Sequence, residues 1–209
     1  MAYDDFTLDM LTQQFGLRVV SKPGVFALAP PVTPSALLEE TLADTLPLAL
    51  SVGTEKAHSE FIIAPVLAET RRQLGHQISV FSGVDFTVDP DVGLGGICDY
   101  LLSLSPLQLF VQAPVVAVVE AKNENLRSGL GQCVAEMLAA QRFNARRGAE
   151  LPVLYGVVTT GSNWKFLRLS GSEVIVDEEE YYIQHPQTIL GILVFMVREA
   201  LEQQGEAPP

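Results

Sequence analysis

Three charged residues interrupt the most apolar part of this sequence, and their types suit the binding of a hard metal ion. The run Val115–Ala121 (VVAVVEA) is apolar except for Glu120, and Lys122 follows it directly. Because side chains alternate along a strand, we expect Glu120 and Lys122 on one face of a sheet. Asp99 interrupts the preceding apolar run, Ile97–Leu104, in the same way. Such charges are costly unless they are paired or bound, and two carboxylates suit Mg²⁺ or Mn²⁺.

The metal site requires that the two strands be antiparallel neighbours. A hairpin through Leu104–Pro114 would then bring Asp99 beside Glu120. An acid-x-Lys triplet alone is a weak signal, and its position after a buried strand and before a helix strengthens it. The alternative is an ion pair at the sheet edge of an unrelated α/β domain, in which the two carboxylates do not converge.

This arrangement resembles the PD-(D/E)xK nuclease superfamily, which has the restriction-endonuclease-like fold. The signature of that superfamily is an Asp on one strand and Glu-x-Lys on the next, as in Asp99 and Glu120-x-Lys122. The sequence motif Gly96-x-x-Asp99-Tyr100 is also common in the family. The resemblance therefore implies a metal-dependent nuclease.

Two further residues extend the resemblance, which covers about residues 54–170. Glu60 precedes the strands, on a helix where many members have an additional acid. Gln132 stands where RecB-like members have a glutamine, which would hydrogen-bond the lysine, the water or the DNA backbone. Two positions depart from the pattern: Cys98 replaces the family's proline before the aspartate, and Glu136 replaces the RecB-like tyrosine.

The resemblance implies a Mg²⁺-dependent hydrolase of DNA phosphodiester bonds, with Mn²⁺ as a substitute metal. Its catalytic residues would be Glu60, Asp99, Glu120, Lys122 and Gln132. Asp99, Glu120 and the backbone carbonyl of Ala121 would hold the metal, with Glu60 supporting it directly or through water. Lys122 would position or deprotonate the attacking water. The alternative is a catalytically silent member of the same fold that serves as a binding or assembly module.

The charge balance limits how this chain could bind DNA. Asp+Glu is 25 against 13 for Lys+Arg, so the net charge is −12 and the mean field repels phosphate. The exception is the segment 121–150, whose arginines are the predicted DNA contacts: Arg127, Arg142, Arg146 and Arg147. The preference of helix C-termini for arginine explains the last three nearly as well. We also expect a homodimer, and DNA delivery by a partner protein.

The pattern along the chain predicts one α/β domain with a central mixed sheet flanked by helices, a restriction-endonuclease-like core. Within residues 1–209, we expect a helical elaboration (1–53), a nuclease-like core (54–170), and an edge strand, closing helix and frayed tail from Gln203 (171–209). Expected helices span 4–15, Thr33–Leu50, Thr54–Leu74, Leu126–Arg147 and Pro186–Gln203. Expected strands span Leu17–Val20, Val25–Ala27, Ile78–Val84, Ile97–Leu104, Val115–Ala121, Val153–Thr159, Asn163–Leu169 and Glu173–Val176.

Cysteine content and hydropathy add two expectations. Cys98 and Cys133 have no spacing that indicates a zinc site or a disulfide framework. The first ten residues are acidic, and no apolar run reaches the roughly 18 residues of a membrane span. We therefore expect a soluble, cytoplasmic protein with no membrane partner.

Overall fold

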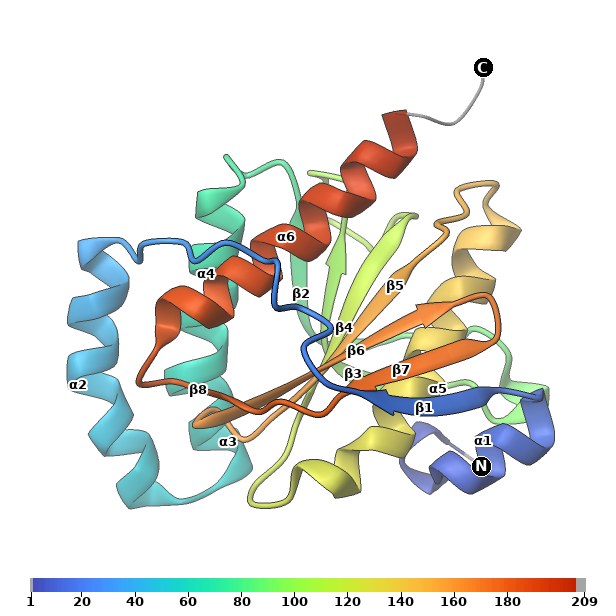
Figure 1. The fold of residues 1–209 in the computed structure, drawn as a ribbon, viewed down its shortest axis with the longest axis horizontal. Helices are drawn as coiled ribbons and strands as arrows, with labels where there is room; N and C mark the ends of the chain where they lie inside the picture. The colour runs from blue at the N-terminus through green and yellow to red at the C-terminus, as the bar shows by residue number, and fades with distance from the viewer. Residues whose placement is uncertain (1, 206–209) are drawn as a thin grey trace.

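The computed structural model describes residues 2–205, which form an eight-stranded sheet with helices on both faces (Figure 1). The helices are α1 (Leu8–Phe15), α2 (Ala36–Val52), α3 (Glu55–His58), α4 (Ala64–Gln73), α5 (Leu126–Arg146) and α6 (Pro186–Gly205). The strands are β1 (Arg18–Lys22), β2 (Ser79–Asp85), β3 (Ile97–Ser103), β4 (Val115–Ala121), β5 (Leu154–Thr159), β6 (Asn163–Ser170), β7 (Glu173–Asp177) and β8 (Tyr181–Tyr182).

The sheet is mixed, with the strand order β1-β7-β6-β5-β4-β3-β2 and with β8 paired to β6. Strands β2, β3 and β4 form an antiparallel meander, and the long helix α5 crosses over to make β5 parallel to β4. The predicted α/β class and mixed sheet are therefore confirmed. The prediction of an edge strand at Glu173–Val176 is wrong, because β1 pairs with β7 in parallel and covers its outer side.

The central strand β4 is buried at all seven positions and separates two apolar cores. The first core contains buried side chains from α2, α4 and α6, and the second contains side chains from α1 and α5. Trp164 and Phe166 of β6 are fully buried in the first core. Since β4 has a helix layer on each side, a charged residue within it is held in a dry environment.

Two local expectations near the N-terminus are corrected. The helix expected from Thr33 begins at Ala36 instead, because the Ser35 hydroxyl caps it by accepting a hydrogen bond from the Leu38 N–H. The buried Glu69 carboxylate also accepts hydrogen bonds from the N–H and hydroxyl of Ser35. Residues 25–27 form turns rather than a strand.

The expected single helix Thr54–Leu74 is interrupted just before Pro65. A π-helical turn, Ser59–Ile63, joins α3 to α4, and the Ala64 N–H bonds to the Ser59 carbonyl five residues back. Pro65 has no N–H to give to the Phe61 carbonyl, so that oxygen accepts a hydrogen bond from the Thr45 hydroxyl of α2 at 2.6 Å. The break is therefore stabilised from outside the helix.

The end of the chain differs from the expected frayed tail. Residues 203–205 continue α6, and the remainder of the expected tail, 206–209, lies outside the described residues. None of the helices in the described range is long and apolar enough to cross a membrane.

Candidate functional site

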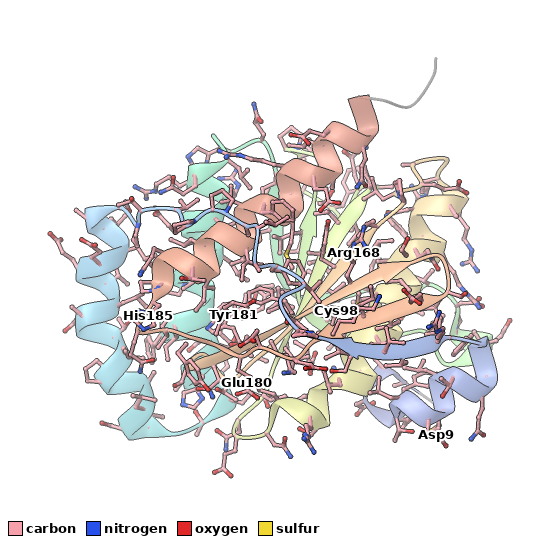
Figure 2. The ribbon with its side chains drawn as sticks, in the orientation of Figure 1. Asp9, Cys98, Arg168, Glu180, Tyr181 and His185 are labelled. Carbon is pink, nitrogen blue, oxygen red and sulfur yellow. The ribbon has the colours of Figure 1, made fainter. Side chains whose placement is uncertain are left out.

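The two predicted site acids, Asp99 and Glu120, lie on neighbouring antiparallel strands. Tyr100 of β3 lies opposite Val119 of β4, and one further step in that register places Asp99 opposite Glu120. Directly opposed residues have Cβ atoms about 4.5–5.5 Å apart. The Asp99 Oδ2 atom accepts a hydrogen bond of 2.8 Å from the Ala121 N–H, which fixes this carboxylate against β4. Figure 2 labels the adjacent Cys98 within the sheet.

Glu120 and Lys122 form an ion pair at the boundary between the core and solvent. The Lys122 Nζ lies 2.5 Å from the Glu120 Oε1, with side-chain exposures of 21% and 1%. Burial and the facing Asp99 charge raise the pKa of Glu120 to about 8, although the Lys122 ammonium acts to lower it. Partial burial alone would lower the pKa of Lys122, but its contact with Glu120 raises it. One lysine therefore does not compensate both carboxylates.

Helix α5 supplies the next partners of Lys122. The Lys122 Nζ donates a 3.1 Å hydrogen bond to the Gln132 Oε1, and the Gln132 Nε2 donates one of 3.2 Å to the Glu136 Oε1. Gln132 and Glu136 are four residues apart and share one face of the helix. The structure thus joins Glu120, Lys122 and Gln132, and it adds Glu136, whose helical spacing from Gln132 was the available sequence signal.

Glycines and a cap allow α5 to approach the site closely. Asn125 caps the helix by accepting a hydrogen bond from the Arg127 N–H. A Cβ at Gly129 would lie 2.7 Å from the Val158 side chain and 3.0 Å from that of Lys122. A Cβ at Gly131 would lie 2.1 Å from a backbone oxygen of the N-terminal segment. Only glycine fits at both positions, so the helix can pack directly on the ends of β4 and β5.

The site has carboxylate oxygens that protein groups do not satisfy. Within the described chain, Glu120 Oε2 and Glu136 Oε2 are both buried and without a hydrogen-bond partner. Complete burial, reinforced by the charge of Glu120, raises the pKa of Glu136 well above its usual range. An unpaired Glu120 oxygen beside Asp99 fits a hard divalent cation. Among the described residues, however, no group of three or more His, Cys, Asp or Glu side chains forms a metal cluster.

Glu60, the fifth predicted catalytic residue, lies on the exposed side of the π-helical turn. It forms an i,i+4 ion pair with Lys56 at 3.1 Å, and its side chain is 53% exposed. Among the described residues, no hydrogen bond or ion pair joins it to Asp99 or Glu120. The acid of this region that acts on the site is Glu55 of α3, whose charge raises the pKa values of Glu120 and Lys122.

The predicted basic surface is divided between the two ends of α5. Arg142 and Arg146 both form ion pairs with Asp89 in the β2–β3 connection, and Arg147 lies over a phenylalanine ring. Arg142 is 16 residues from the start of α5, or about 24 Å along the helix. Arg142 and Arg146 therefore hold the β2–β3 connection against α5, and DNA contact by Arg142, Arg146 and Arg147 stays a prediction.

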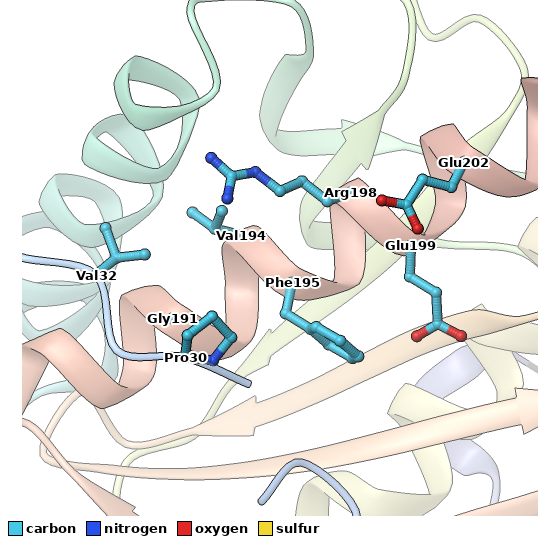
Figure 3. A pocket seen from close by; sticks show the side chains of 8 residues that line it. All are labelled: Pro30, Val32, Gly191, Val194, Phe195, Arg198, Glu199 and Glu202. Atoms are coloured by element: carbon cyan, nitrogen blue, oxygen red, sulfur yellow. The ribbon is translucent and has the colours of Figure 1, made fainter. Parts of the chain in front are cut away.

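Arg127, in contrast, lines a hollow beside the candidate site. The hollow has a volume of about 510 Å³ and includes Arg127 and Lys165. In register, Glu120 lies beside Val158, and Val158 lies beside Lys165, so Lys165 is two strands from Glu120 on the same sheet face. Two strand spacings are about 10 Å. The pocket along α6 in Figure 3 contains no predicted site residue.

Comparison with protein-family models, curated proteins and solved structures finds no significant match to this chain. The function of this chain must therefore be inferred from the geometry of the site.

Proposed function

We propose that this protein is a Mg²⁺-dependent hydrolase of DNA phosphodiester bonds, with Mn²⁺ as an alternative metal. The observation that carries the proposal is the position of Asp99 opposite Glu120, with the Lys122 ammonium 2.5 Å from Glu120. Acidic oxygens next to a lysine at the edge of a dry core combine a place for a cation with a fixed hydrogen-bond donor. Asp99, Glu120 and the Ala121 carbonyl would hold the metal.

The bound metal would supply Lewis acidity toward a phosphate oxygen and would lower the pKa of a coordinated water. The protein itself fixes the lysine that faces this chemistry. A lysine ammonium has three N–H donors, and here Glu120 and the Gln132 Oε1 accept from it. The third donor remains for an attacking water or a phosphate oxygen.

The charge of the chain limits how the substrate would arrive. The net charge of −12 repels a polyanion, but Arg127 and Lys165 line one hollow, and Lys165 is two strand spacings, about 10 Å, from Glu120. Glu178 and Glu180 line the same hollow, so its own field is close to balanced. Substrate delivery by a partner protein, or by a second copy of the chain, is part of the proposal.

The test combines metal titration with a cleavage assay. Mg²⁺ and Mn²⁺ are titrated by calorimetry into the native protein and into Asp99→Asn, which keeps an acceptor for the Ala121 N–H but loses the charge. Asp44→Asn on the exposed side of α2 is the matched control. The expected result is metal binding and metal-dependent cleavage of labelled DNA in the native and control proteins, with both lost in Asp99→Asn.

The second candidate function is a non-catalytic binding module of similar architecture. The close Glu120–Lys122 ion pair favours it, because one oxygen of this carboxylate is already occupied by a protein cation. Absence of metal binding at millimolar concentration, in a folded native protein, would overturn the hydrolase proposal in favour of this module.

A further inference from the structure

We infer that Glu136 is a positioning residue whose carboxyl group fixes the side-chain amide of Gln132 so that its oxygen faces Lys122. The inference rests on the proposed function for its catalytic meaning, because it assigns a role at the same site. The hydrogen-bond arrangement that it assigns can be tested by a measurement that does not depend on DNA cleavage.

The direction of the hydrogen bonds carries the argument. The ammonium of Lys122 has only donors, so it can bond to the oxygen end of the Gln132 amide but not to the nitrogen end. The Gln132 Oε1 is 3.1 Å from the Lys122 Nζ, and the Gln132 Nε2 is 3.2 Å from the Glu136 Oε1. The Glu136 acceptor therefore favours one of the two amide orientations, and that orientation gives Lys122 its second anchor.

The surroundings of Glu136 are those of an apolar side chain. Glu136 is fully buried, as are its helix neighbours Cys133, Met137 and Ala140. Its Oε2 has no hydrogen-bond partner among the described residues. Burying a carboxyl with one oxygen unsatisfied opposes folding, so an apolar residue of similar size would be expected to stabilise this position.

The deep side of this position is closed by the N-terminal segment. Tyr3 is buried, and its hydroxyl donates a hydrogen bond to the Phe86 carbonyl. Phe6 packs against α5, where Gly131 leaves no space for a Cβ. Because this cover excludes water from the inner side of α5, the loss of the Glu136 acceptor would not readily be replaced by solvent.

The test uses the small number of lysines in the chain, which are Lys22, Lys56, Lys122 and Lys165. Protein labelled with ¹³C at the lysine side chains gives four resolvable ε-carbon signals, and Lys122→Arg identifies the one that belongs to Lys122. The spectra of the native protein, Glu136→Gln and Glu136→Met are compared without metal. Glu136→Leu is the second apolar variant, used if Glu136→Met does not fold.

The expected result separates positioning from a purely structural role. Glu136→Gln keeps a carbonyl acceptor, so the Lys122 signal and the cleavage rate should remain near native. The apolar variant should move the Lys122 signal, resist urea at least as well as the native protein, and lower kcat roughly 10-fold without changing Mg²⁺ affinity. An unmoved Lys122 signal in a folded apolar variant would overturn the inference. If native protein cleaves no DNA, the lysine signal still decides the inference while the hydrolase proposal fails separately.

Discussion

Raising the pH of the metal-free protein should weaken its folding, and Glu120 should account for a large part of the loss. Burial, together with the charge of Asp99, raises the pKa of Glu120 from 4.5 to about 8 in the folded state. The folded protein therefore binds this proton more tightly than the unfolded chain does. The stabilisation is fully present below pH 4.5, and it is lost as the pH rises through about 8.

The size of the effect follows from the width of that window. Between the two pKa values, each pH unit changes the free energy of unfolding by about 1.4 kcal/mol for one group. From pH 5.5 to 7.5, Glu120 should therefore contribute a loss of about 2–3 kcal/mol. The raised pKa of Glu136 acts in the same direction, so the native protein should lose more than this amount.

The assay is urea unfolding at pH 5.5 and pH 7.5 for the native protein, Glu120→Gln and the exposed control Asp44→Asn. Glutamine does not titrate, so the variant should lose about 2–3 kcal/mol less than the native protein over this interval. Asp44→Asn should behave as the native protein does. Equal losses in native and Glu120→Gln proteins would refute the claim that burial and Asp99 together outweigh the Lys122 ion pair.

Three other predictions concern the metal, the π-helical turn and the packing of α5. Mg²⁺ at tenfold its Kd should raise the free energy of unfolding of the native protein by about 1.4 kcal/mol, and thermal unfolding of Asp99→Asn should show no such increase. Thr45→Val removes the hydroxyl that donates to the Phe61 carbonyl and should lower the free energy of unfolding by about 1–3 kcal/mol. The exposed control Ser51→Ala should lower it by less than about 0.5 kcal/mol. Equal decreases for the two variants in urea unfolding would contradict the role assigned to Thr45. Gly131→Ala places a Cβ 2.1 Å from a backbone oxygen and should lower stability by about 1–3 kcal/mol, and unchanged urea unfolding would show that the N-terminal segment is not fixed there.

Local sequence patterns were sufficient for the centre of the sheet but not for its edge. The apolar run Val115–Ala121 predicted β4 with its observed bounds, since a strand buried on both faces has a distinctive composition. The position of β7 could not be read in this way. Its outer partner β1 lies about 150 residues earlier in the chain, and parallel pairing over such a separation leaves no local mark.

The residues of the candidate site likewise divide into those that the sequence identifies and those that it does not. Asp99, Glu120 and Lys122 could be selected because a charge within or beside an apolar strand is unusual. Gln132 was selected by resemblance, but the role of Glu136 depends on which end of an amide faces a lysine. That property is set by contacts between elements and has no signature in residue order. Arg142 and Arg146 of α5 form ion pairs with Asp89, which is more than 50 residues away in sequence, and residue order does not indicate this contact either.

The π-helical turn Ser59–Ile63 has a consequence for how this chain tolerates changes in length. Each residue of an α-helix is rotated by about 100° around the helix axis relative to the one before it. The π-helical turn contains one residue more than an α-helical turn, and it accommodates that residue without rotating α4. Deleting one residue from this turn would permit a continuous helix around the same buried face of α4. Both flanks would then keep their present phase, because the wide turn already absorbs the additional residue, and Glu55 would stay on the side of the helix that faces the site. A deletion within α3 or α4 would instead rotate the residues before it by about 100°, so the π-helical turn is the place in this segment where the chain can lose one residue.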